Sequence, residues 1–218
     1  MHSQGAEPGP KKRQGAVSSI TDDEIREKYL ERAIRELNDL GRDLSACQDC
    51  PRGTVMPVQG SGHPQADIFM LKRSATPSEI EEGVAFYGRA GNALMKSFKR
   101  LAIDPMVVFG TLCAKCPLTD PSHASDACIA RVAEEIAIVQ PRIVVVMGEE
   151  ALGTLNDLEL PLSDRIEPVE GEVQRLTPTI DALFVPDIDN SLDAQNAKQH
   201  FWSAFRVLGD WYDRLPPY

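Results

Sequence analysis

Four cysteines in two separated pairs constrain this chain more than any other feature of its sequence. Cys47 and Cys50 form a C-x-x-C motif, and Cys116 and Cys128 follow much later in the chain. Thiolates at a C-x-x-C spacing can hold a metal centre from a tight turn, and a second pair brought in by the fold completes a four-sulfur site. The pattern predicts such a site and leaves open whether it holds an iron–sulfur cluster or zinc.

Composition narrows the class of protein. The chain has 218 residues, five cysteines and a formal net charge of -10. With no apolar segment of signal-peptide type, the cysteines favour a reducing, cytoplasmic compartment and metal binding over disulfides. No apolar stretch has the length of a membrane span, so we expect no membrane partner. The negative charge argues against general polyanion binding, because phosphate recognition needs clustered Lys and Arg.

The chain divides into a tail and one domain. Residues 1–19 are rich in Gly, Pro, Ser and basic side chains without apolar periodicity, which predicts a disordered tail. Residues 20–218 are expected to form a single domain. It begins with a helix, because Thr21-Asp-Asp-Glu24 has the pattern of a capping box and apolar residues recur at helical spacing until about Gly41.

Strands and helices alternate through the rest of the domain. The predicted strands are residues 66–71, 106–109, 142–147 and 182–185, with a further short strand around Val173. The predicted helices are residues 92–103, 126–139, 148–156 and 194–211. This alternation predicts a three-layer α/β/α sandwich with a mostly parallel central sheet. Ligands of such sheets bind outside the carboxyl ends of the strands.

Several motifs, taken in order, resemble one known family. They are Cys47-Gln-Asp-Cys50, Phe86-Tyr-Gly-Arg-Ala-Gly91, Lys115-Cys116, Cys128 and Ile143-Val-Val-Val-Met-Gly148. Their order and spacing resemble the iron–sulfur uracil-DNA glycosylases, family 4 of the uracil-DNA glycosylase superfamily, over roughly residues 44 to 212. The resemblance implies a uracil-DNA glycosylase-like fold. It also implies a structural [4Fe-4S] cluster on Cys47, Cys50, Cys116 and Cys128, with zinc as the alternative, and leaves Cys113 as a small buried hydrophobic residue.

The motifs that would handle uracil are degenerate. The family's Gly-Glu-x-Pro-Gly turn corresponds to Lys72-Arg-Ser-Ala-Thr76, so Arg73 stands in place of the acid. Leu112 stands in place of the uracil-reading Asn. The family's His-Pro-Ser loop corresponds to 186–191, which contains Asp187 and Asp189 but no histidine. Phe86 alone survives as a base-stacking candidate, and no catalytic residue is assigned.

The resemblance and the lost motifs lead to one main expectation. We expect a diverged pseudoenzyme that keeps the fold and the cluster, has lost uracil excision, and binds a nucleotide, a nucleic acid or a protein. The acidic charge weakens the case for DNA or a nucleobase as ligand, and Glu79, Glu81 and Glu82 are interpreted as solvated loop residues. One alternative is an active DNA glycosylase of base-excision repair with a rebuilt site, using Arg73 as an electrophile. Another is a redox-sensing iron–sulfur protein.

Overall fold

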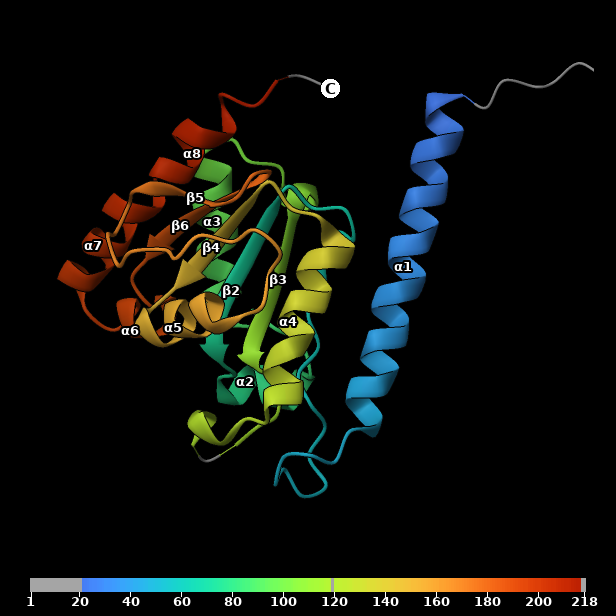
Figure 1. The fold of residues 1–218 in the computed structure, drawn as a ribbon. Coiled ribbons are helices and arrows are strands. Elements are labelled where there is room, and N and C mark those ends of the chain that lie inside the picture. The colour runs from blue at the N-terminus through green and yellow to red at the C-terminus, as the bar shows by residue number, and fades with distance from the viewer. Residues whose placement is uncertain (1–20, 119, 217–218) are drawn as a thin grey trace, which may run out of the picture.

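A central β-sheet organises the molecule (Figure 1). The computed structural model describes residues 21–118 and 120–216, and within them the sheet has six strands in the order β1-β3-β2-β4-β6-β5. The predicted disordered tail, residues 1–19, lies outside the described residues. The strand bounds are β1 Ser61–Gly62, β2 Ile68–Ser74, β3 Val108–Ala114, β4 Ile143–Met147, β5 Val173–Thr177 and β6 Ile180–Val185.

The sheet is mostly parallel, as the sequence predicts. Strands β3, β2, β4 and β6 run parallel to one another, while β1 and β5 pair antiparallel at the two edges. Every residue of β4 is buried, because helices cover both faces of the sheet. This explains its uninterrupted apolar sequence, since a strand buried on both faces needs no polar alternation. The predicted three-layer α/β/α class is confirmed.

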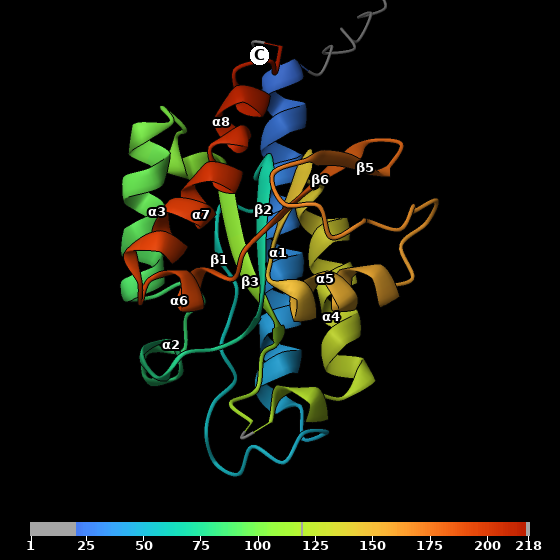
Figure 2. The same cartoon turned by 90° about the vertical axis from the view of Figure 1, so that its left-hand side faces the viewer.

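The two faces carry different helices (Figure 2). Helices α4 and α5 pack with the side chains of Phe69, Leu71 and Val144 on one face. Helices α3, α7 and α8 pack with Ile68, Met70 and Val145 on the other. Helix α1 lies alongside α4 (Figure 1). The helix bounds are α1 Asp22–Ala46, α2 Pro77–Glu82, α3 Arg89–Arg100, α4 Asp126–Val139, α5 Glu149–Asp157, α6 Ile188–Ser191, α7 Gln195–Phe205 and α8 Val207–Tyr212.

Two boundaries differ from the prediction in ways that matter for the site. Strand β2 continues to Ser74, so Lys72 and Arg73 belong to the strand and not to the following loop. Strand β3 continues to Ala114, so Cys113 is a strand residue and not a loop residue. In both cases pairing with a parallel neighbour extends the strand beyond its apolar run.

Helix α1 begins where the sequence predicts. Thr21 and Glu24 form the capping box, with the Thr21 N–H 2.8 Å from the Glu24 carboxylate. The helix runs past the predicted end near Gly41 as far as Ala46, and Cys47 is its C-cap. At the other end of the chain, the predicted final helix is divided into α7 and α8 around Arg206. Among the described residues, no helix has the length and apolar character needed to cross a membrane.

Candidate functional site

Three cysteine thiols converge below the carboxyl end of β3. The Sγ atoms of Cys50, Cys116 and Cys128 all lie within 4.8 Å of one another, and all three residues are buried. They come from the loop after α1, the end of β3 and the first turn of α4. A buried set of three sulfur donors suits zinc or an iron–sulfur cluster, both of which bind thiolate ligands. The sequence-predicted metal ligands are therefore brought together in three of four cases.

The fourth predicted ligand, Cys47, is not part of this trio. Its thiol donates to the Asp49 carboxylate at 3.4 Å, and its side chain is half-buried. Cys113 points away into the core between the sheet and α4 and α5, as a small buried hydrophobic residue. Burial raises the pKa of the Cys113 thiol to about 11. Cys113 therefore stays protonated at neutral pH. It is not expected to bind metal, because the thiolate is the form that does so.

The trio has an uneven electrostatic environment. Burial raises the pKa of Cys50, but hydrogen bonds with the Ser125 N–H, the Ser125 hydroxyl and the neighbouring thiols lower it below its ordinary value. The Ser125 N–H lies 3.4 Å from the Cys50 Sγ. Burial and the two neighbouring cysteines raise the pKa of Cys116 to about 12. Without a metal, a thiolate that forms in the trio disfavours deprotonation of the other two thiols. A bound cation would relieve this repulsion between negative charges, because it stabilises thiolates.

A buried ion pair adjoins the cysteines. The Lys115 ammonium lies 2.8 Å from the Glu135 carboxylate and also donates to Thr111 and to the Leu112 carbonyl. Lys115 precedes Cys116 on the chain, and Glu135 lies two turns after the Cys128 turn of α4. The pair therefore ties the end of β3 to α4.

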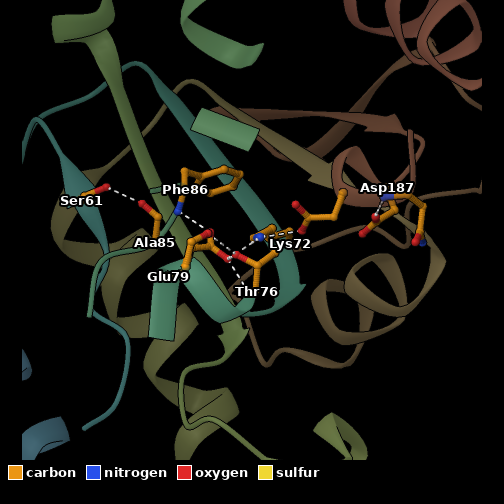
Figure 3. Close-up of polar contacts among 10 residues, drawn as sticks. Ser61, Lys72, Thr76, Glu79, Ala85, Phe86 and Asp187 are labelled. Atoms are coloured by element: carbon orange, nitrogen blue, oxygen red, sulfur yellow. Dashed lines mark hydrogen bonds and ion pairs between the residues drawn. The ribbon is translucent and has the colours of Figure 1, made fainter. Parts of the chain in front are cut away.

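A second buried lysine lies at the carboxyl end of β2. The Lys72 ammonium contacts the Glu79 carboxylate at 2.7 Å (Figure 3). It also contacts the Asp189 carboxylate at 2.6 Å. The side chain of Lys72 is 1% exposed and that of Glu79 is fully buried. Burial raises the pKa of Asp189, and the Lys72 charge opposes that rise. We name these three residues the Lys72 triad.

Glu79 organises the turn around this triad. Its carboxylate accepts the Thr76 N–H at 2.6 Å and the Phe86 N–H at 2.5 Å, besides the Lys72 ammonium. The interpretation of Glu79 as a solvated loop residue is wrong. A sequence signal for it existed: Thr76-Pro-Ser-Glu79 has the pattern of a capping box with proline at the first helical position, which predicts the short helix α2.

Phe86 is held in an uncommon backbone conformation beside the triad. Its φ is +60°, a left-handed value that non-glycine residues rarely adopt. Its ring packs directly over Gly110, where a Cβ would lie 2.5 Å from the ring. The Lys72 ammonium lies 5.5 Å from the ring centroid, in the cation–π range (Figure 3). A charged side chain of the same protein therefore lies beside the predicted stacking ring, which also lines an open cavity of about 450 Å³.

Arg73 points to the opposite face of the sheet, because successive strand residues alternate. Its guanidinium donates to the Thr154 hydroxyl at 2.9 Å and to the Pro121 carbonyl at 2.8 Å. These contacts fasten β2 to α5 and to the loop before α4. Leu112 is fully buried in an apolar cluster with Val58 and Ala85. Neither residue therefore presents a polar group to the ring of Phe86.

Asp187 and Asp189 lie at the start of α6. The Asp187 carboxylate accepts the Asn190 N–H at 2.8 Å and caps the helix, whereas Asp189 joins the Lys72 triad. Both line an open cavity of about 620 Å³ at the carboxyl ends of β2, β4 and β6. The charged residues lining that cavity are mainly acidic: Glu149, Glu150, Glu170, Asp187 and Asp189, against Arg73 and His200.

The fold, the cysteine trio and the sheet-edge site together define an α/β protein of a known class. The sequence model described as "Uracil DNA glycosylase superfamily" matches residues 59–206, and the chain belongs to that superfamily. It is also similar to the type-4 uracil-DNA glycosylase of Pyrobaculum aerophilum. The two are 26% identical over 143 residues, which cover 63% of this chain and 73% of the relative. The family resemblance inferred from the motifs is confirmed.

Proposed function

We propose that this protein is a non-excising member of the superfamily that retains a [4Fe-4S] cluster and now acts by binding. Cys47, Cys50, Cys116 and Cys128 would hold the cluster, with Cys47 turning inward as the fourth ligand. The cluster would supply a rigid cross-link between the end of α1, the end of β3 and the start of α4. Zinc on the same cysteines is the alternative. Such free thiols suit a reducing compartment, the cytoplasm.

The Lys72 triad is the main observation that supports the proposed loss of uracil excision. An enzyme that releases a base must hold it against an aromatic face and read its polar edge. Here the Lys72 ammonium lies 5.5 Å from the centroid of the Phe86 ring, with Glu79 and Asp189 as its counter-ions. At the position of the reading amide there is the buried Leu112. A base that stacked on the Lys72 side of the ring would have to separate these buried ion pairs, and breaking such pairs is costly.

The charge at the sheet edge bears on the present ligand. The cavity beside α6 is lined mainly by carboxylates, and these repel a phosphate backbone at short range. This favours a nucleoside-like ligand or a protein partner over DNA at that edge. Nucleic acid binding elsewhere on the surface would show as affinity that falls steeply with salt.

The test is uracil release from single- and double-stranded oligonucleotides. The protein is purified with its metal content measured, and the type-4 enzyme of Pyrobaculum aerophilum serves as the positive control. We expect release no faster than in buffer from protein that is folded and carries its metal. Release that scales with protein concentration and is lost in Phe86→Ala would overturn the proposal.

An active glycosylase with a rebuilt site is a second candidate, favoured by the cavity of about 620 Å³ at the usual ligand edge. Its general base would be Asp187, which lines that cavity. The expected electrophile, Arg73, is bound instead to Thr154 and Pro121 on the other face of the sheet. This candidate requires that Asp187→Asn abolish a measurable release rate, and it fails if no such rate exists.

A redox-sensing protein is a third candidate, favoured by the N–H donated from Ser125 to Cys50. Hydrogen bonds to cluster sulfurs tune reduction potentials. Reversible reduction of the purified protein at a physiological potential would support this role, and a centre that cannot be reduced in that range would exclude it.

A further inference from the structure

Arg52 fastens the cysteine loop by three hydrogen bonds. One Nη atom donates to the carbonyls of Ser45 and Cys47, each at 2.9 Å, and the other donates to the Val55 carbonyl at 2.5 Å. The backbone adds a turn, since the Arg52 N–H donates to the Cys50 carbonyl at 2.8 Å. The guanidinium fork therefore joins both ends of the segment that carries Cys47 and Cys50.

The location of these carbonyls explains why a cation belongs there. Ser45 lies in the last turn of α1 and Cys47 is the C-cap, so both carbonyls are at the negative end of the helix dipole. The last turn of α1 contains no basic residue of its own. Arg52 supplies that missing charge from the following loop.

The charge of Arg52 is not matched by a carboxylate. The three acceptors of its guanidinium are neutral carbonyls, and within residues 21–118 and 120–216 no carboxylate lies within ion-pair distance of it. The neighbouring cation, Lys115, differs because Glu135 neutralises it at 2.8 Å. Through its hydrogen bond to the Cys47 carbonyl, the Arg52 guanidinium lies against the loop that carries Cys47 and Cys50.

We propose that Arg52 is a positioning residue of the cysteine centre with two separable roles. Its fork fixes the geometry of the Cys47–Cys50 loop, and its unmatched charge offsets the negative charge of the metal-bound thiolates. The inference rests on the proposed metal centre and assigns to this chain an outer-sphere partner beyond the four cysteines. Such partners commonly change metal affinity by about 10- to 100-fold.

Two substitutions separate the roles. Arg52→Gln removes the charge and most of the fork, whereas Arg52→Lys keeps the charge and removes the fork. Each protein is purified with its native metal, and the rate of metal transfer to a chelator is measured. We expect Arg52→Gln to lose metal at least about tenfold faster than the original protein, with Arg52→Lys between the two. If the centre holds iron, Arg52→Gln also lowers the reduction potential, and Arg52→Lys leaves it near the original value.

Arg42→Gln is the matched control. Arg42 is an exposed arginine of α1 that pairs with Asp39, so its loss removes the same charge without touching the cysteine loop. Rates within twofold of the original for Arg52→Gln would overturn the inference, and equal rates for Arg52→Lys and Arg52→Gln would overturn its charge component. If Arg52→Gln does not fold, Arg52→Lys alone must still lose metal faster. A metal-free original protein would instead refute the proposed metal centre itself.

Discussion

The ammonium of Lys72 lies 2.6 Å from the carboxylate of Asp189, although 117 positions separate the two residues in the chain. Both stand at positions where the resemblance to the type-4 family predicts a different residue. The cation on β2 and the anion at the start of α6 neutralise each other. Glu79 supplies the second anion. The contact places mutually neutralised charged groups beside the ring of Phe86.

Lys72→Met tests how much the triad contributes to stability. The variant leaves the Glu79 and Asp189 carboxylates without their cation, and uncompensated buried charge costs about 3 to 5 kcal/mol. We expect a loss of that order in the free energy of unfolding measured by chemical denaturation. Arg89→Met is the control, because its ion pair with Asp193 is exposed and contributes at most about 1 kcal/mol. Equal losses in the two variants would contradict the account.

Leu112→Asn restores the type of residue that reads uracil in the related family. Because Leu112 is fully buried beside Val58 and Ala85, the introduced amide would have no polar partner there. An unsatisfied buried polar group costs about 1 to 3 kcal/mol beyond the lost apolar burial. We expect lower stability and no uracil release. A stable Leu112→Asn protein that gains excision would show that the pocket is open after all.

Substitution of individual cysteines tests the ligand set. Cys116→Ala and Cys128→Ala should lose most of the bound metal, because each removes one donor of the trio. Cys47→Ala should also lower the metal content if this residue is the fourth ligand. Cys113→Ala should keep its metal, since Cys113 lies in the core. Elemental analysis of the purified variants measures this, and the reverse order for Cys113 and Cys116 would refute the assignment.

Cys113 also gives a pH dependence. Burial raises the pKa of its thiol from 9.0 to about 11, so the folded protein holds this proton more tightly than the unfolded chain. The resulting stabilisation is complete below pH 9 and is lost as the pH rises to about 11. Two pKa units correspond to about 2 to 3 kcal/mol. The stability difference between the original protein and Cys113→Ala, at equal metal load, should shift in favour of the variant by this amount between pH 8.5 and pH 11. A constant difference would argue against the shift.

The sequence was sufficient for the sheet because its signals are local. Residues 143–147 form an apolar β-branched run, which predicts a strand wherever the rest of the chain goes. Cys50, Cys116 and Cys128 could be grouped because thiolates at such spacings share a metal. The capping box at Thr21 likewise depends on only four residues.

The Lys72 triad could not be predicted in the same way. A lysine after a strand normally marks the return of the chain to solvent, and its burial depends on two carboxylates from distant segments. The end of β2 was misplaced for the same reason. The role of Glu79 as a capping residue can be predicted from the sequence, because its capping-box pattern with Thr76 is local. Its contact with the Phe86 N–H cannot, because that contact depends on a loop that turns back toward α2.

A titration of free uracil against protein carrying labelled phenylalanine rings tests the central claim most directly. The Phe86 ring signals are identified by their absence in Phe86→Leu. The account predicts that these signals do not move in the original protein up to millimolar uracil. The reason is that the Lys72 ammonium, 5.5 Å from the ring centroid, hinders stacking of a base on the ring. A saturable shift of the Phe86 signals in the original protein would mean that a base still reaches this face, and would contradict the account.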